Sequence, residues 1–574
     1  MISFVGADEI LEQVNARGLL QSPRVVEVEG EKEVEGELVL PSGAIHTVRL
    51  PKFLPLNLPA VRLIPTAATA FLPHVTEDKG TICYAGAEGL VLNSFRPGDL
   101  LEEALKRVEE TLDVGTSDER GAEFVDEFEI YWANLPNPDS IRNVADPSSD
   151  PGWRILLTAK GKPTYLANTV NEVSAYYSTT VDVGGRTIRK VPYFPLAEGS
   201  VLVPPSRASG VWSVAAARRA LLPCLAADHK RRMLKMLGKR PKSMEYCFFD
   251  LPRTNGGSTI FGLKFIAPGT RHPLLEGGTA ESVVPVVVRR TDRSFLLPRG
   301  GASVSLTDCR VLVVGCGAIG GHVVLELARG GLLRQTLLDP DSFQAENAFR
   351  HALGKRYDGE KKAEAMAKEL RLQLPYVEVE GIAQDVVGAL SSGRIQLDQF
   401  DLVVAATGNP TVEMFMEGEL HRLEQRPKAI YSWVEPMGIG GHAVLTGVPE
   451  GRGCLRCLFT ARVEGLPDLH NRLAFAEQGV SYGRALSGCG SLHMPFGSLD
   501  ALRTAEISVR LAIQSLQGEV KENVAVSWRG EATEFRGQGH HTTPRYEMDS
   551  DKTELKVSDF DNPRCPVCHG DECG

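Results

Sequence analysis

The chain has 574 residues, of which 43% are hydrophobic and 24% charged, and its formal net charge is -10 at pH 7. At roughly 100 to 200 residues per domain, this length predicts three or four domains, each with its own core. An acidic chain without a long run of Lys and Arg is not expected to bind nucleic acid directly.

The N-terminus and the longest apolar stretch indicate in which compartment the protein works. Residues 1–9 lack the basic region and apolar core of a secretory signal, which predicts a cytoplasmic protein. The apolar stretch 311–328 contains glycines, His322 and Glu326, so we expect a strand, a loop and a helix rather than a membrane span. The eleven cysteines are then expected to be nucleophiles or metal ligands rather than disulfides.

The first predicted domain, residues 1–145, mixes helices with an antiparallel sheet. Residues 8–20 have helical apolar spacing. Three β-branched segments, separated by Gly30 and by a Pro-Ser-Gly turn, predict a meander of strands at 25–34, 36–40 and 45–50. Asp99, with Glu102 three residues later, predicts the N-cap of an amphipathic helix.

The second predicted domain, residues 146–285, begins at a segment rich in turn-forming residues, 146–152. It contains a helical stretch at 214–237 and apolar strands near 260–266. No glycine loop or cluster of Cys, His, Asp and Glu indicates chemistry here. Cys224 and Cys247 have apolar neighbours and are interpreted as core residues.

The third predicted domain, residues 286–574, alternates strands and helices, which indicates βαβ units around a parallel sheet. The first strand, 311–314, is followed by a loop with glycines at positions 315, 317 and 320, suited to hold phosphate at a helix N-terminus. Asp339 lies at the separation at which an acid binds a ribose hydroxyl. A dehydrogenase using NAD therefore stays open at this point.

Residues further along favour ATP. Arg350 and Lys362 are cations that can neutralise a triphosphate and its leaving pyrophosphate. With Asn347, their spacing resembles the Rossmann-like adenylation domain of the ubiquitin-activating superfamily, which includes the ThiF-type sulfur-carrier adenylyltransferases. The resemblance implies that Asp339 holds the ribose of ATP, and that Asn347, Arg350 and Lys362 serve Mg²⁺ and the phosphates.

One position departs from that family. Where it has Thr-Asp-Asn, with an Asp that helps to hold Mg²⁺, this chain has Thr407-Gly408-Asn409. Either another acid such as Asp341 serves the metal, or the phosphates hold it, because Mg²⁺ readily keeps several waters.

Two CxxC pairs suit a structural zinc ion with four thiolate ligands, Cys454, Cys457, Cys565 and Cys568. Their placement also resembles the sulfur-carrier adenylyltransferases. His569 and Cys573 lie close enough in sequence to replace one ligand. The alternative, a redox CxxC, needs only one pair and a thioredoxin-like setting.

Two further cysteines are predicted to carry acyl groups. Cys489 lies in a glycine-flexible loop that resembles the crossover loop of the activating family, where a thiolate attacks the acyl adenylate. Cys83, in Gly80-Thr81-Ile82-Cys83, resembles the catalytic cysteine of ubiquitin-conjugating enzymes. His74 stands where that family has a supporting Asn, so we expect it either to donate a hydrogen bond during catalysis or to serve the fold.

The order of these parts is similar to that of the fused activating and conjugating enzymes of bacterial CBASS anti-phage operons. The resemblance implies a conjugating α+β domain, a linker domain like an inactive adenylation domain, and a zinc-containing adenylation domain that forms a homodimer. It also implies ATP, Mg²⁺ and Zn²⁺ as cofactors. The implied partners are a lysine-bearing target protein and the C-terminal tail of a cGAS-like nucleotidyltransferase or of a ubiquitin-like protein.

The predicted reaction is ATP-dependent activation of that tail, thioester capture on Cys489, transfer to Cys83 and amide formation with a target amine. Three alternatives stay open from the sequence: a sulfur-carrier adenylyltransferase, an NAD-dependent dehydrogenase, and a zinc-stabilised adaptor whose nucleotide fold is a relic.

Overall fold

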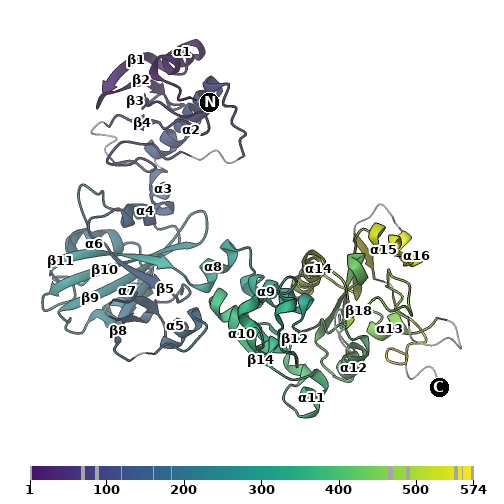
Figure 1. Ribbon diagram of the computed structural model, residues 1–574. Coiled ribbons are helices and arrows are strands. Elements are labelled where there is room, and N and C mark those ends of the chain that lie inside the picture. The colour runs from purple at the N-terminus through teal and green to yellow at the C-terminus, as the bar shows by residue number, and fades with distance from the viewer. Residues whose placement is uncertain are drawn as a thin grey trace. The chain divides into compact units, whose positions relative to one another are not determined.

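The computed structural model describes residues 3–65, 71–84, 89–117, 119–159, 161–182, 184–462, 470–485, 492–548, 554–558 and 560–569. The chain forms two compact units, one of Met1–Val170 and Val183–Thr291, the other of Asn171–Asp182 and Asp292–Gly574. Among the described helices, none combines the length and the apolar character needed to cross a membrane. Figure 1 labels the elements in chain order.

The N-terminal part of the first unit is an antiparallel sheet in the order β1-β2-β3-β4, with helices α1 and α2 packed against it. The core between them is formed by side chains such as Ile10 and Val14 of α1, Leu101 and Val108 of α2, and Val34 of β2. The bounds are α1 Ala7–Arg17, β1 Gln21–Val28, β2 Glu31–Val39, β3 Ile45–Leu50, β4 Arg62–Leu63 and α2 Pro97–Thr116. The predicted helices and meander are confirmed.

The start of α2 differs from the prediction. The helix begins at Pro97, before the expected N-cap Asp99, because Pro is suited to the first helical position. Asp99 and Glu102 instead bind the guanidinium of Arg17 on α1, at 2.7 and 2.6 Å. The two acids therefore join the helices rather than cap one of them.

The rest of the first unit is a closed barrel of mixed strands in the order β10-β11-β5-β7-β6-β8-β9. Its strands are β5 Asp139–Asn143, β6 Gly152–Thr158, β7 Tyr165–Ala167, β8 Thr187–Pro195, β9 Met244–Pro252, β10 Ser258–Pro268 and β11 Ala280–Arg290. Strands of this barrel thus lie on both sides of the predicted limits at 146 and 285. The closed topology also differs from the open sheet that the resemblance to an inactive adenylation domain implies for this region.

Four helices accompany the barrel: α3 Arg120–Asp126, α4 Phe128–Ala133, α6 Val214–Leu221 and α7 Ala227–Leu237. The single helical stretch predicted at 214–237 is two helices, because Pro223 between them cannot continue an α-helix. Helix α4 is fixed to the barrel by Trp132, whose indole N–H donates to the Val286 carbonyl at 3.1 Å. Phe128 packs on Phe261 with ring centres 4.6 Å apart.

The second unit is built on an eight-stranded sheet in the order β14-β13-β12-β15-β16-β17-β20-β21. The first five strands are parallel to their neighbours and the last three antiparallel. The strands are β12 Arg310–Val314, β13 Arg334–Leu338, β14 Glu378–Ile382, β15 Leu402–Ala405, β16 Lys428–Val434, β17 Gly440–Thr446, β20 Val524–Arg529 and β21 Glu554–Val557, with a separate pair β18 Arg484–Ala485 and β19 Leu492–His493. The predicted parallel sheet is confirmed.

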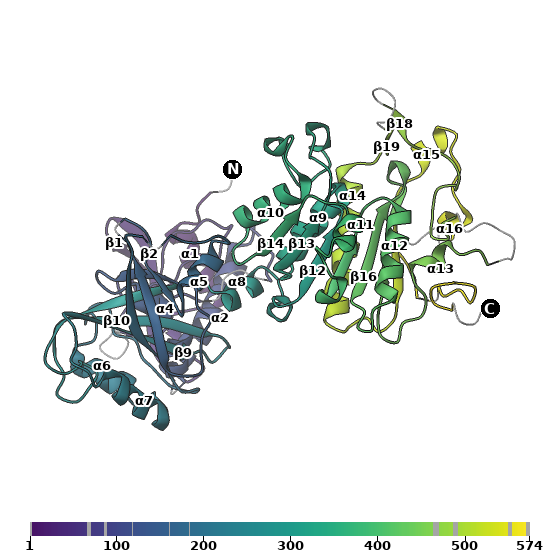
Figure 2. The ribbon, with the colours of Figure 1, turned by 90° about the horizontal axis from the view of Figure 1, so that it is seen from below.

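Helices cover both faces of this sheet (Figure 2). The core of one face includes residues of α9, α10 and α14, and the core of the other includes residues of α11, α12 and α13. The helices of the unit are α5 Val170–Tyr176, which begins at the last residue of the first unit, α8 Arg293–Arg299, α9 Ala318–Arg329, α10 Lys362–Gln373, α11 Val386–Ser391, α12 Pro410–His421, α13 Leu455–Phe459, α14 Ser498–Leu516, α15 Thr533–Gly537 and α16 Pro544–Glu547. Short 3-10 turns lie at Val304–Leu306, Ala345–Asn347, Lys355–Tyr357, Leu397–Gln399 and Pro436–Gly438.

Candidate functional sites

The segment that carries Cys83 is held by backbone pairing. The Cys83 N–H donates to the His74 carbonyl at 2.6 Å, next to a β-bridge between Val75 and Ile82. Gly80 has φ +65°, and a Cβ on it would lie 2.2 Å from the Leu63 carbonyl oxygen, so no other residue fits without moving the backbone. The loop therefore presents an exposed thiol from a fixed backbone.

His74 lies between two carboxylates. Its Nε2 is 2.8 Å from Glu123 Oε2, and its Nδ1 is 3.2 Å from Glu127 Oε1. The hydrogen bond to Glu127 is the main reason that the pKa of His74 is raised to about 9, and the bond to Glu123 adds to it while burial opposes it. The ring is thus an imidazolium at neutral pH with both N–H groups engaged, so donating to an oxyanion would require one of these bonds to break.

A cavity of about 360 Å³ opens beside Cys83. Its lining residues include several with polar or charged side chains, among them His74, Glu77, Asp78, Glu127, Asn134 and Arg207. Burial, and then the negative charge of Glu127, raises the pKa of the Cys83 thiol. The thiol is therefore protonated at neutral pH, and it becomes a nucleophile only when a proton is removed.

The glycine loop after β12 makes a tight turn at the start of α9. Gly315 has φ +88°, and a Cβ there would lie 2.6 Å from the Ala406 carbonyl oxygen, while a Cβ on Gly320 would lie 1.8 Å from the Gly315 carbonyl oxygen. Gly317, the N-cap of α9, has nothing within 4 Å of its Cβ position. The first and last glycines are thus required by close packing, and the middle one leaves open space at the helix N-terminus.

Asp339 follows β13 and lies beside this loop. Its Oδ2 accepts the backbone N–H of Cys316 at 2.7 Å, and its Oδ1 accepts that of Asp341 at 2.8 Å. Burial raises the pKa of this carboxyl, which the two N–H groups partly offset. A carboxylate keeps acceptor capacity beyond two bonds, so the predicted role toward a ribose fits this position.

The predicted phosphate-binding residues lie in two groups. Arg350 donates from Nη1 to the Met494 carbonyl at 3.1 Å and stacks over Phe496, with its Cζ 4.7 Å from the ring centre. Asn347 lies in the same turn, since its carbonyl accepts the Arg350 N–H. Lys362 begins α10 and binds Asp341, with Nζ 2.9 Å from Oδ2.

A cavity of about 320 Å³ lies against the glycine loop. Its walls are mainly apolar and are formed by Gly317, Ala318, Ile319, Ala406, Thr407, Gly408, Pro410, Glu413, Trp433, Val434, Leu455, Phe459, Asn471, Met494 and Phe496. Met494 and Phe496 are also the residues that Arg350 contacts, so Arg350 lies next to two residues of this wall. Arg350, Asp339, Asn347 and Lys362 are themselves not among the lining residues.

Glu413 was not predicted. It is 3% exposed, and its Oε1 accepts both the backbone N–H and the hydroxyl of Thr407, at 3.1 and 2.8 Å. Burial is the main cause that raises the pKa of this carboxyl to about 7. A sequence signal existed, because the acid lies one helical turn after the Thr-Gly-Asn segment, but nothing there reveals its burial.

The four predicted zinc ligands meet in one cluster. Their sulfurs lie within 4.8 Å of one another, and the separations include 3.9 Å for Cys454 and Cys457, 3.6 Å for Cys454 and Cys565, and 3.7 Å for Cys457 and Cys568. A tetrahedron with Zn–S bonds of about 2.3 Å has S···S edges of about 3.8 Å, whereas a disulfide needs about 2.05 Å. The donor set thus fits zinc and not a disulfide.

Neighbouring side chains close the cluster. Arg472 donates from Nη2 to the carbonyls of Cys457 and Phe560, at 2.8 and 3.0 Å, and so joins the two CxxC segments. His569 binds Asp561 at 3.0 Å and stands outside the four-sulfur set. Cys573 lies outside the residues that the structure describes.

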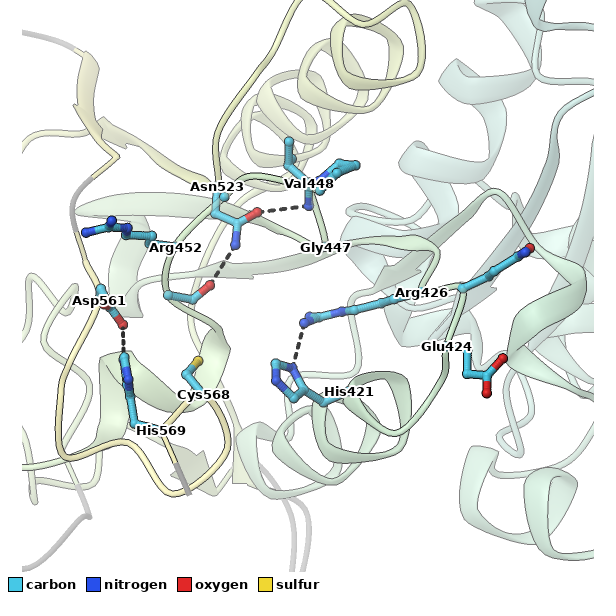
Figure 3. A pocket seen from close by; sticks show the side chains of 14 residues that line it. His421, Glu424, Arg426, Gly447, Val448, Arg452, Asn523, Asp561, Cys568 and His569 are labelled. Atoms are coloured by element: carbon cyan, nitrogen blue, oxygen red, sulfur yellow. Dashed lines mark hydrogen bonds and ion pairs between the residues drawn. The ribbon is translucent and has the colours of Figure 1, made fainter. Parts of the chain in front are cut away.

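A cavity of about 650 Å³ adjoins the cluster at Cys568 (Figure 3). Its polar side chains already bind each other: Arg426 contacts Glu417 and His421, and Asn523 contacts the loop at Val448 and Gly453. The glycine loop and Cys83 are not among its lining residues. This cavity is therefore not one that the predicted chemistry uses.

Cys489 and the pair Glu435 and His442 are the remaining residues singled out in the sequence. Cys489 lies outside the described residues, so its surroundings stay a prediction. Glu435 and His442, which the sequence left without a role, are buried, and His442 binds Glu435 at 2.9 Å and Ser527 at 2.7 Å. Because all three side chains are buried, we interpret them as a structural link between β16, β17 and β20.

Comparison with known proteins gives two domain matches. A family model described as "ThiF family" matches residues 295–526, and one described as "Prokaryotic E2 family B" matches residues 21–139. The first match contains the glycine loop and its cavity, and the second contains Cys83 and His74.

Curated relatives extend over most of the chain. The Escherichia coli (strain TW11681) protein named "ATP-dependent ubiquitin transferase-like protein Cap2" is 24% identical over 522 residues, which is 83% of this chain and 85% of that protein. The protein of the same name from Pseudomonas aeruginosa (strain BWHPSA011 / Pa011) is 25% identical, covering 80% of this chain and 83% of that one. Among solved structures, E. coli MccB has a TM-score of 0.33 at 17% identity, covering 46% of this chain and 66% of that one, too slight a likeness to support a functional conclusion.

Proposed function

We propose that this chain, an activating and conjugating enzyme that joins a prokaryotic E2 domain to a ThiF domain, activates a partner protein's C-terminal carboxylate with ATP and transfers it to a target amine. The observation that carries the proposal is one chain with two matched sites. One is an exposed thiol beside a cavity with several charged residues, and the other is a glycine loop at a mainly apolar cavity. Neither site alone would complete such a reaction.

The first step is adenylation. A carboxylate oxygen of the tail attacks the α-phosphorus of ATP, and pyrophosphate leaves with the electrons of the broken P–O bond. The N-terminus of α9 at Gly317 faces open space for phosphate, and Arg350, which contacts the wall residues Met494 and Phe496, is a cation next to this cavity. Mg²⁺, when bound, would add charge on the phosphates, and Asp339 would hold the ribose.

Two acyl transfers follow in the proposal. The Cys489 thiolate attacks the adenylate and expels AMP, which gives a thioester. The Cys83 thiolate then attacks that thioester and releases Cys489 as thiolate. Finally a target amine, most simply a lysine, attacks the Cys83 thioester, loses a proton and forms an amide while the Cys83 thiolate leaves.

The surroundings of Cys83 suit the last step. An acceptor lysine arrives as a cation and must lose a proton, and Glu77, Asp78 and Glu127 line the cavity that it would enter. His74 holds Glu127 next to the thiol through its Nδ1. In this proposal His74 acts by positioning Glu127, which is how we interpret its predicted catalytic role.

The cysteine cluster has a structural role in the proposal. Zinc held by Cys454, Cys457, Cys565 and Cys568 would have four protein ligands and no open position, so no reaction step passes through it. It would fasten the C-terminal segment to α13, near the cavity residues Leu455 and Phe459.

The biological setting follows from the relatives. Their name, ATP-dependent ubiquitin transferase-like protein Cap2, supports a ubiquitin-like transfer. The order of the domains, which resembles that of CBASS enzymes, favours a role in anti-phage defence. Within the proposal, the activated tail belongs to a cGAS-like nucleotidyltransferase or a ubiquitin-like protein, and the enzyme works in the cytoplasm as a homodimer.

Pyrophosphate exchange tests the adenylation step. With the C-terminal peptide of the candidate partner, labelled pyrophosphate is expected to enter ATP, and omission of the peptide abolishes the exchange. An NAD-dependent dehydrogenase or a relic fold would show no exchange with any peptide. A sulfur-carrier adenylyltransferase would show exchange but would form no product that depends on Cys83.

A further inference from the structure

The wall of the cavity at the glycine loop has one acidic side chain and no cationic one among the described residues. Among the described residues that line it, Glu413 is the only ionisable side chain. It is 3% exposed and forms no ion pair with any described residue, and it accepts hydrogen bonds from the N–H and hydroxyl of Thr407 and from the N–H of Gly408. Burying a carboxylate is costly unless a cation balances its charge.

Glu417, one turn further along α12, shows how the fold treats a buried acid elsewhere. It is 0% exposed and is paired with the guanidinium of Arg426. It also accepts the hydroxyls of Tyr431 and Thr446, at 2.6 and 3.1 Å. The same helix thus carries one acid with its own cation and one acid that faces a cavity without one.

Other acids near the glycine loop are already engaged. Asp341 is 67% exposed and bound to Lys362, and both oxygens of Asp339 accept backbone N–H groups. At position 408, glycine has φ +65°, and the space where its Cβ would lie is open. A carboxylate is therefore absent from the wall at 408, and the nearest acid on the cavity wall is Glu413, which binds this same Thr407-Gly408 segment.

We infer that Glu413 supplies the carboxylate that this pocket directs toward the divalent cation of a bound nucleotide, in place of an acid at position 408. The inference rests on the proposed function, because it assumes that the cavity holds a nucleoside triphosphate. The cation that balances Glu413 then arrives with the ligand, so Glu413 makes nucleotide binding depend on Mg²⁺. Thr407 and Gly408, which bind the carboxylate, hold it in place.

The test is binding of the non-hydrolysable analogue α,β-methylene-ATP to the full chain, measured by calorimetry with Mg²⁺ and again with EDTA. For the unchanged protein, Mg²⁺ is expected to tighten binding about tenfold or more. Glu413→Gln keeps an oxygen that accepts from Thr407 but loses the charge. We expect it to bind the analogue in Mg²⁺ as weakly as the unchanged protein does in EDTA, with an unaltered melting temperature.

A second substitution is expected to restore the Mg²⁺ dependence of binding that Glu413→Gln removes. Gly408→Asp has room for its side chain, and Asp tolerates positive φ better than most residues, so Gly408→Asp combined with Glu413→Gln is expected to regain the Mg²⁺ dependence. Glu419→Gln, which changes a partly exposed acid on the same helix paired with Arg422, should leave it unchanged.

The binding measurements distinguish failure of the inference from failure of the proposed function. If Glu413→Gln responds to Mg²⁺ as the unchanged protein does, or if Asp341→Asn alone removes the response, the inference is wrong. If the unchanged protein binds no analogue under either condition, the proposed function itself fails.

Discussion

The two candidate sites differ in the exposure to solvent and in the charges of the side chains on their walls. The wall of the cavity beside Cys83 carries several charged side chains, and its acids Glu77 and Asp78 are exposed, with the cationic ring of His74 beside them. The cavity at the glycine loop is mainly apolar and has one buried acid, Glu413. This difference suits the two kinds of chemistry that we propose: phosphate displacement in a mainly apolar site, and acyl transfer to an amine that arrives from solvent.

The largest expected effect concerns the glycine loop, where one substitution should disturb the packing of the protein and another only the binding of its ligand. Gly320→Ala places a Cβ 1.8 Å from a backbone oxygen, so we expect a loss of about 1 to 3 kcal/mol in unfolding free energy, together with lost ATP binding. Gly317→Ala meets no protein atom, so its stability should be unchanged while its ATP affinity falls about tenfold, equivalent to about 1.4 kcal/mol. Urea unfolding and calorimetry measure the two quantities. Equal stability losses in both variants would contradict the interpretation that Gly317 faces the ligand.

Metal removal should affect only one of the two sites. Mass spectrometry of the native protein is expected to show about one zinc ion per chain, and Cys457→Ser should lose it. Because the cluster joins the C-terminal segment to α13, the variant should melt at a lower temperature and bind ATP more weakly. Alkylation of Cys83 should be unaffected. Cys309→Ser, which changes a half-buried thiol outside the cluster, is the control and should keep both the metal and the melting temperature.

The smallest expected effect concerns the acids around His74. Its folded pKa, about 9, is above the ordinary value of 6.5, so the stabilisation is fully present below about pH 6.5 and is lost as the pH rises through 9. Glu127→Gln should flatten this part of the pH profile of unfolding. It should also lower the Cys83 pKa slightly, because the Glu127 charge raises it, and so speed alkylation by iodoacetamide at pH 8. Slower alkylation in this variant would contradict the assigned electrostatics.

The sequence was most informative where chemistry requires fixed spacing. The four thiols of the cluster come from two CxxC pairs, and they meet as predicted because each pair is local and the two segments are adjacent in space. The glycines at 315 and 320 were also predictable, since each fills a position where a Cβ would meet backbone. Alternating strands and helices likewise predicted the parallel sheet.

What the sequence did not reveal depends on long-range burial. His74 binds Glu123 and Glu127, which come from a helical segment far along the chain. Tertiary contacts align them, such as the packing of α4 on the barrel and the hydrogen bond from Tyr131 to the Leu72 carbonyl. The barrel itself closes through parallel pairs such as β11 with β5, which no local pattern encodes. Glu413 resembles any helical surface acid until the fold buries it.

The central claim is that the two sites form one acyl relay, and the most direct measurement is the intact mass of the enzyme after incubation with ATP and the partner's tail. We predict a reducible adduct on the unchanged protein that is absent in Cys489→Ala. Cys83→Ala should keep the first adduct and form no amide conjugate. If either variant still produces conjugate at the unchanged rate, the relay is contradicted.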